Sequence, residues 1–178
     1  MKKSFQLQLL NTRLLNKGYT LIELLIVLVL FVLITTLSIT NFGFLHRSIT
    51  RAELYHLYSL CYYLQHKAMA TRQEQKLYID ISHNTYTYDN TTYQLPQSVS
   101  FGYLSGVKGP PTAPKKILSK PVTFKNDTVE FYPDGIISSG SIYIRDAYNN
   151  SLHALTNGIA HVSFIRLYIY NKTWRLVV

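Results

Sequence analysis

The sequence predicts an α+β fold in which a long N-terminal helix packs on an antiparallel β-sheet or sandwich. Three observations lead to this prediction. A nearly continuous apolar run covers residues 19–40, apolar residues then recur with helical spacing to about residue 72, and beyond Gln75 the pattern changes to the alternation of strands. We expect four segments, with the bounds 1–18, 19–40, 41–74 and 75–178.

The second segment is apolar enough to cross a membrane once. No polar side chain occurs from Leu24 to Ile34. A helix over residues 19–39 would extend about 31 Å, close to the hydrocarbon thickness of about 30 Å. Residues 1–17 carry no acid and four cations, Lys2, Lys3, Arg13 and Lys17. The positive-inside rule therefore keeps this end in the cytoplasm and places the later segments across the membrane. A plain signal anchor would share these properties.

A glycine and a lone carboxylate mark the start of the apolar run, which reads Gly18, Tyr19, Thr20, Leu21, Ile22, Glu23. A carboxylate inside a membrane helix costs about 2.5 to 3.5 kcal/mol, so Glu23 needs a partner or a function. The alternative is hydration by lipid headgroups. From Lys17 to about Thr40, the pattern resembles the class III signal of type IV prepilins and type II secretion pseudopilins. Tyr19 stands where that signal usually has phenylalanine.

The resemblance implies how the chain is processed and where it is found. Residues 1–18 would be a leader that prepilin peptidase removes by cutting after Gly18, and Tyr19 would then be N-methylated. In a filament, Glu23 would meet the amino terminus of a neighbouring subunit and set the axial register. The implied partners are prepilin peptidase, other pilins or pseudopilins, the assembly platform and the lipid bilayer. The implied location is the inner membrane, with one span, a cytoplasmic N-terminus and an extracytoplasmic or periplasmic C-terminal domain that joins a pilus-like filament.

Helical periodicity continues beyond the apolar run. Its apolar stripe consists of Leu54, Leu57, Tyr58, Cys61, Leu64 and Ala68. No proline occurs between Tyr19 and Leu95, so both parts are expected to form one helix of about 54 residues that ends near Arg72. The chain has one cysteine, Cys61, and so the exported domain must be stable without an internal disulfide.

The last segment is expected to consist of strands. The predicted strands are 77–81, 85–88, 99–103, 122–124, 129–132, 141–145, 162–170 and 174–178. Turns are expected at His83-Asn84, at Asp89-Asn90 and at Pro133-Asp134-Gly135. Residues 105–120 are rich in glycine, proline and lysine, which predicts an exposed loop. The last strand is apolar, and we expect it inside the sheet.

The strand region also resembles the GspH/FimT-like pseudopilins, whose pilin fold has the predicted layout. The resemblance rests on Phe131 to Gly135, followed by Gly140, Ser141, Ile142, Tyr143 and Ile144. It implies that Gly135 is the turn residue and that Gly140 opens the next strand. Members of this family often carry a Gly-Arg pair in the last hairpin, whereas this chain has Lys172, Thr173, Trp174 and Arg175 there.

The sequence contains no pattern typical of an enzyme. The histidines His46, His56 and His66 do not share a helix face, because ten residues turn a helix by about 280° net of full turns. His153 and His161 lie near Asp146 without a further ligand at metal-binding spacing. Neither a nucleophile elbow nor a phosphate-binding glycine loop occurs. We therefore expect neither catalysis nor a cofactor or metal.

Nucleic-acid binding is the main alternative to a purely structural role. The formal net charge of +9 falls to +5 once the four leader cations are removed. In the exported domain Lys172, Trp174 and Arg175 could contact phosphates and stack on bases. The predicted function is that of a minor pseudopilin in a type II secretion pseudopilus, which would contact secreted protein cargo. A type IV or competence minor pilin that binds DNA or a surface, and an unrelated signal-anchored protein, are the alternatives.

Overall fold

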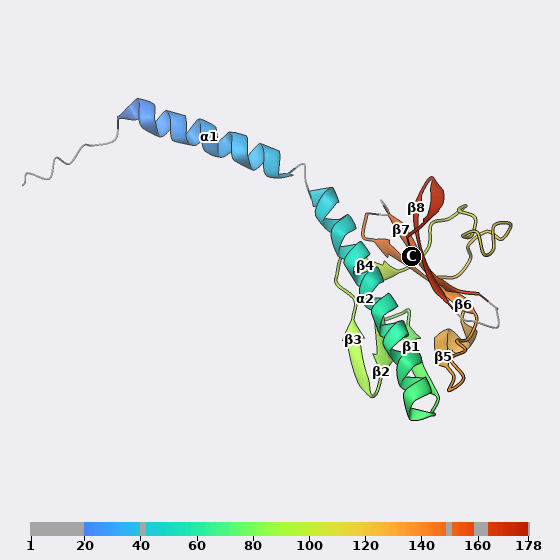
Figure 1. The fold of residues 1–178 in the computed structure, drawn as a ribbon. Coiled ribbons are helices and arrows are strands. Elements are labelled where there is room, and N and C mark those ends of the chain that lie inside the picture. The colour runs from blue at the N-terminus through green and yellow to red at the C-terminus, as the bar shows by residue number, and fades with distance from the viewer. Residues whose placement is uncertain (1–19, 40–41, 149–150, 159–163, 178) are drawn as a thin grey trace, which may run out of the picture. The chain divides into compact units, whose positions relative to one another are not determined.

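The structure is a computed structural model that describes residues 20–39, 42–148, 151–158 and 164–177. The chain divides into two units, Met1–Thr40 and Asn41–Val178. The described part of the first unit is helix α1, Leu21–Ile39. The second begins with helix α2, Phe42–Thr71, and continues with strands (Figure 1). Residues 40 and 41 lie outside the described ranges, so one continuous helix stays a prediction. In the ranges that are described, no helix combines the length and the hydropathy needed to cross a bilayer.

Two antiparallel sheets follow α2 in the second unit. The strands are β1 Gln75–Asp80, β2 Thr85–Tyr88, β3 Thr91–Gln94, β4 Val99–Phe101, β5 Thr128–Phe131, β6 Gly140–Asp146, β7 Leu152–Asn157, β8 Ile165–Asn171 and β9 Thr173–Leu176. One sheet has the order β3-β2-β1-β5, and the other has the order β4-β6-β7-β8-β9. The predicted α+β layout, a helix followed by antiparallel sheets, is thus confirmed for this unit.

The apolar stripe of α2 forms the centre of the main core. Leu54, Leu57, Cys61, Leu64 and Ala68 are buried as predicted, and Tyr58 is partly buried at its edge. Side chains from both sheets pack in the same core, among them Leu77, Tyr86, Phe131, Ile144 and Leu167. Each fully buried leucine contributes about 1.5 to 3 kcal/mol of transfer free energy. The helix therefore holds the two sheets together mainly by apolar packing, and polar contacts such as that of Lys67 with Asp89 add to it.

A second, smaller core lies on the other face of the five-stranded sheet. It contains Leu118, Tyr143, Leu152, Ala154 and Tyr168. The glycine- and proline-rich segment at 105–120 forms part of this cover, with Leu118 buried and Val107 partly buried. The segment has no regular element, as predicted, and its ends meet at an isolated bridge between Lys108 and Ile117. Because it covers the sheet, the prediction that this segment is simply exposed is wrong at those positions.

Several turns occur where the sequence predicts them. Asp89 and Asn90 both have positive φ angles, 47° and 60°, as a tight hairpin turn requires. Gly135 has a φ of 84°, which glycine adopts without strain. Gly140 begins β6, and a Cβ there would lie 2.6 Å from the ring of Phe124. Both glycines therefore have the roles that the resemblance implied.

Other predicted strands need correction. Residues 122–124 do not form a strand, and only an isolated bridge joins Val122 to Ile142. Strands β3 and β7 were not predicted. The last strand, β9, lies at the edge of its sheet and is mostly exposed, so its predicted internal position is wrong. Leu176 at the end of this edge strand is 60% exposed, whereas Val177 just beyond it packs partly against the main core. At a sheet edge the sequence pattern carries little information about burial.

Candidate functional site

Glu23 lies in the first turn of α1, where its carboxylate contacts the residue that precedes the helix. The backbone N–H of Thr20 donates to Glu23 Oε2 at 2.8 Å, and the Thr20 hydroxyl donates to the same oxygen at 3.0 Å. The backbone N–H of Glu23 donates to Thr20 Oγ1 at 3.3 Å. These reciprocal contacts form a capping box, which satisfies backbone donors at the helix start. The Thr-x-x-Glu spacing of Thr20 and Glu23 is the sequence signal of a capping box, and it was not used to predict one.

Helix α1 exposes apolar side chains on all sides. Every leucine, isoleucine, valine and phenylalanine from Leu21 to Ile34 is exposed, with Leu21 84% exposed. Apolar surface of this extent in water is unfavourable by about 25 cal/mol per Å². An exposed apolar surface of this extent marks a site of interaction with another apolar surface.

Residues Gly18 and Tyr19, which the resemblance marks as the cleavage and methylation positions, lie outside the described residues. They directly precede the capping box at Thr20. The expected processing site is thus contiguous in sequence with the described start of α1.

Lys172, Trp174 and Arg175 lie in the hairpin that joins β8 to β9. Lys172 has a φ of 62° in the turn, and both Lys172 and Arg175 are exposed. Trp174 is partly buried, and its indole Nε1 donates to the carbonyl oxygen of Lys108 at 2.8 Å. Its ring centroid lies 5.1 Å from that of Tyr170 and 6.3 Å from that of Tyr143. Trp174 therefore anchors the 105–120 segment to the sheet, and the two cations flank it at the surface.

The comparison with protein families concerns the first of these regions. Residues 13–39 match the family model described as the prokaryotic N-terminal methylation motif. The chain carries a class III prepilin signal. This signal is consistent with a type IV pilin-like protein. No curated protein and no solved structure matches the chain.

The matched range has the prepilin signal that the sequence analysis recognised. It begins at Arg13 and ends at Ile39, the last residue of α1. The motif therefore includes Gly18, Tyr19 and Glu23, and it extends over the whole of the exposed apolar helix. Its presence implies processing by prepilin peptidase and assembly with other pilins.

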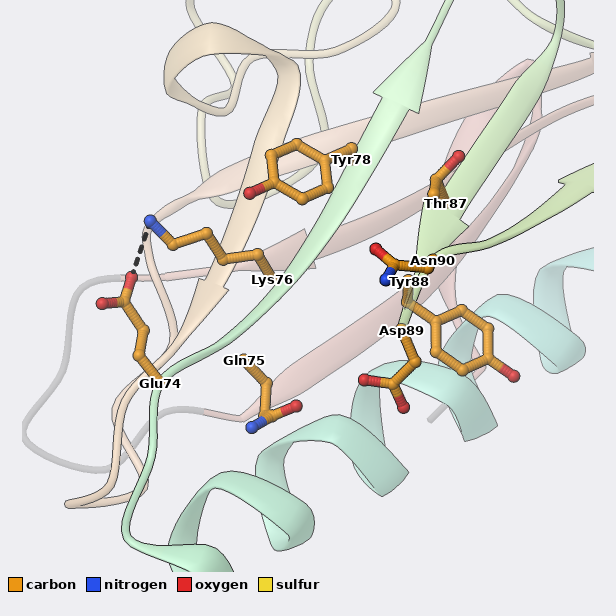
Figure 2. A pocket seen from close by; sticks show the side chains of 8 residues that line it. All are labelled: Glu74, Gln75, Lys76, Tyr78, Thr87, Tyr88, Asp89 and Asn90. Atoms are coloured by element: carbon orange, nitrogen blue, oxygen red, sulfur yellow. Dashed lines mark ion pairs between the residues drawn. The ribbon is translucent and has the colours of Figure 1, made fainter.

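A surface pocket beside β1 and β2 is a second candidate site. Figure 2 shows Lys76 reaching toward Glu74, and their charged atoms lie 3.2 Å apart. Lys76 Nζ also lies 3.7 Å from Glu130 Oε1, and Asp89 pairs with Lys67 of α2. The hydrogen bond to Glu74 raises the pKa of Lys76. All three charged residues that line this pocket thus take part in ion pairs, which is typical of a solvated sheet surface.

The described histidines of the second unit are dispersed. His46 contacts the ring of Tyr148, and His56 accepts or donates a hydrogen bond of 2.8 Å with the hydroxyl of Tyr86. His66 contacts the ring of Tyr62. Among the described residues, no group of three or more histidine, cysteine, aspartate or glutamate side chains is placed to hold a metal ion. His161 lies outside those residues.

His153 differs from the other described histidines because its whole side chain is buried and both of its ring nitrogens lack a hydrogen-bond partner among the described residues, whereas His46 has one such nitrogen, Nδ1. His153 lies in β7 and is 3% exposed. Burial lowers its pKa to about 4, and the charge of Arg51 adds to this effect, whereas the Asp146 carboxylate opposes it. An unpaired buried polar group costs about 1 to 3 kcal/mol. From the sequence, His153 was a candidate only for a metal ligand, because nothing in its local pattern indicates an unpaired imidazole.

We expect the His153→Leu variant to be more stable than the wild type at neutral pH, by about 1 to 3 kcal/mol, because the unpaired nitrogens are removed. The difference in unfolding free energy between the variant and the wild type should grow as the pH falls from 6.5 toward 4. In this window the unfolded chain binds a proton at His153 that the folded chain does not, so the wild type loses up to about 3 kcal/mol that the variant retains. Chemical denaturation at several pH values measures both effects. Parallel stability curves for the two proteins would contradict the prediction.

Proposed function

We propose that the chain is a minor pseudopilin, a low-copy structural subunit of a type II secretion pseudopilus. The observation that carries the proposal is the prepilin motif at residues 13–39, which coincides with a helix of exposed apolar side chains. The order of elements, with a helix first and antiparallel sheets after it, agrees with this class of subunit. The proposed role is structural and requires no catalysis, cofactor or metal.

The proposed pathway begins in the inner membrane. The apolar segment anchors the chain with its N-terminus in the cytoplasm and with the domain at 75–178 on the other side. Prepilin peptidase removes residues 1–18 and methylates the amino group of Tyr19. The assembly platform then moves the helix from lipid into a bundle of neighbouring stems. In both places the apolar side chains of α1 are covered, so transfer between them costs little hydrophobic free energy.

Glu23 is proposed to align the stems within the filament. Both hydrogen bonds that its carboxylate accepts in the described chain use Oε2, and no contact to Oε1 occurs among the described residues. Oε1 is therefore available for a donor from another subunit. The positive amino terminus of a neighbour would supply that donor and neutralise the carboxylate in apolar surroundings. The capping box fixes the direction of the side chain, so the contact has a defined register.

Cleavage tests the proposal most directly. Expressed with prepilin peptidase, the wild-type chain should begin at N-methylated Tyr19, and the Gly18→Ala variant should remain uncleaved. Intact mass and amino-terminal sequencing measure both. Gly158→Ala is a suitable control, because a Cβ at this position meets no atom within 4 Å. If both the wild type and Gly18→Ala keep the leader, the chain is an unrelated signal-anchored protein and the proposal fails.

The role of Glu23 predicts a variant that is processed but does not assemble. Glu23→Gln should be cleaved as the wild type is, yet its recovery in filaments should fall by about tenfold or more, because the neighbour's amino group would lose its counter-charge. Quantitative immunoblotting of sheared filaments and of membranes measures this ratio. Glu74→Gln removes a carboxylate from an exposed ion pair and should leave the ratio unchanged. Equal recovery of both variants would exclude the proposed alignment.

A second candidate function is that of a type IV or competence minor pilin that binds DNA or a surface. The exposed cations Lys172 and Arg175 beside the aromatic cluster of Trp174 favour it. Against it, the indole N–H of Trp174 is already bonded to Lys108, and its ring packs on tyrosines of the sheet. Deletion phenotypes separate the two functions, since a secretion defect supports the pseudopilus and loss of DNA uptake supports the competence pilus.

If DNA binding is the function, the affinity of the full chain for DNA should decrease as the salt concentration rises, because bound cations release counterions. The affinity of the Lys172→Gln/Arg175→Gln variant should decrease less steeply with salt concentration. The difference in slope should correspond to the loss of about two phosphate contacts. Fluorescence anisotropy at several salt concentrations measures the slope. The Arg72→Gln/Lys76→Gln variant removes the same charge elsewhere. A slope reduced equally in both variants would exclude a specific DNA site at the hairpin.

A further inference from the structure

A small cavity lies between the first turns of α2 and the sheet strands β7 and β8. Its volume is about 220 Å³. Two arginines of α2 line one side, and the other side is lined by Ser151, His153, Tyr170 and Asn171. None of the sites described above includes this cavity.

The buried imidazole of His153 points to a ligand-binding role for this cavity. The ring is almost fully buried, and neither nitrogen has a hydrogen-bond partner among the described residues. At neutral pH the ring is uncharged and has one N–H to donate, because burial holds its pKa at about 4. A ligand with an acceptor oxygen in the cavity would satisfy that N–H. In a chain that only needed a packed sheet, an aliphatic side chain would serve better at this position.

The arginines bring two positive charges to the cavity. Neither Arg47 nor Arg51 forms an ion pair among the described residues. The Arg51 guanidinium donates to the hydroxyl of Tyr55 at 3.3 Å and lies 5.6 Å from the centre of that ring. This contact holds its side chain on the helix surface and leaves other N–H groups of the guanidinium to donate.

One carboxylate lies close to the cavity. Asp146 is buried, and it accepts hydrogen bonds from the Ser151 hydroxyl at 3.1 Å and from the backbone N–H of Tyr148 at 3.1 Å. The Ser151 donor is therefore already used. Two guanidinium groups outnumber this single carboxylate, so the cavity favours an anion. The donors come from a helix on one side and from a strand on the other, which suits a tetrahedral oxyanion better than a planar group.

We propose that this cavity binds the phosphate group of an anionic phospholipid headgroup. The proposal rests on the membrane anchoring given under the proposed function. Arg47 follows Ile39, the last residue of α1, by eight residues, and because α2 begins at Phe42 these can span at most about 18 Å. A headgroup at the end of a membrane-embedded α1 is thus within reach of the chain. Tethering to the same bilayer raises the effective headgroup concentration far above that of free phosphate. The contact would hold the exported unit at the membrane until assembly withdraws the stem.

The test uses the full chain in nanodiscs of phosphatidylcholine alone and of phosphatidylcholine mixed with phosphatidylglycerol. Thermal unfolding is followed through the fluorescence of Trp174, the single tryptophan. Phosphatidylglycerol should raise the unfolding midpoint of the wild type, because a ligand that binds only the folded state stabilises it. Inorganic phosphate, added to phosphatidylcholine nanodiscs, should give a smaller rise at the same cavity.

Three variants show whether the cavity is responsible. Arg47→Gln/Arg51→Gln should abolish both rises, whereas Arg72→Gln, which removes an exposed arginine just beyond the same helix, should retain them. His153→Leu should fold and should weaken phosphate binding by about tenfold, because one hydrogen bond to an anion is lost. Equal responses of the double variant and Arg72→Gln would overturn the proposal, since general attraction to an anionic surface would then suffice.

Two further outcomes would also overturn it. A rise with inorganic phosphate but none with phosphatidylglycerol would exclude a lipid source, and no rise with either probe would exclude the anion site. Leader cleavage is measured on the same preparations, so the two proposals fail separately. Normal cleavage without a lipid response overturns the anion site alone. A lipid response of uncleaved protein overturns the proposed function and leaves the site established.

Discussion

The second unit, Asn41–Val178, depends on one apolar stripe along α2. Both sheets bury a face against this stripe, and the two sheets belong to one core because the same helix contacts both. Neither a disulfide nor a metal contributes among the described residues. Loss of packing along the stripe would therefore expose both sheets together, which is why its spacing is so regular in the sequence. The same helix also presents Arg47 and Arg51 beside β7 and β8, so the cavity there depends on the same packing.

The clearest elements to predict from the sequence were those with one buried face, whereas β7, which is buried at every position, was missed. The stripe of α2 and the alternation of β1 gave correct positions, because half of each element faces solvent and half faces the core. Strand β7 is buried at all six positions, so its sequence has no alternation to detect. The polar residues Thr156 and Asn157 also made β7 hard to predict, because polar residues in a sequence indicate a loop more often than a buried strand. Strand β3 was missed for the opposite reason, because three of its four residues are exposed.

The candidate sites differ in the same way. The processing motif is local in the sequence, so Gly18, Tyr19 and Glu23 could be recognised from a run of six residues. The capping box at Thr20 is equally local in the sequence. Its hydrogen bonds can be predicted only when the residue at which the helix starts is known. The anion cavity unites residues from positions 47 to 171, and no pattern along the chain connects them. Its decisive feature, an imidazole without a partner, is a property of packing.

Cys61 lies within the stripe of α2 and is 1% exposed, and burial raises the pKa of its thiol to about 12. The thiolate form is therefore rare, and in an oxidising compartment the native protein is protected from cross-linking to other chains. Because the thiol becomes reactive only when α2 separates from the sheets, its alkylation rate reports how often that separation occurs. The alkylation rate of this one native side chain thus measures how often the domain opens, and no label has to be introduced into the protein beforehand.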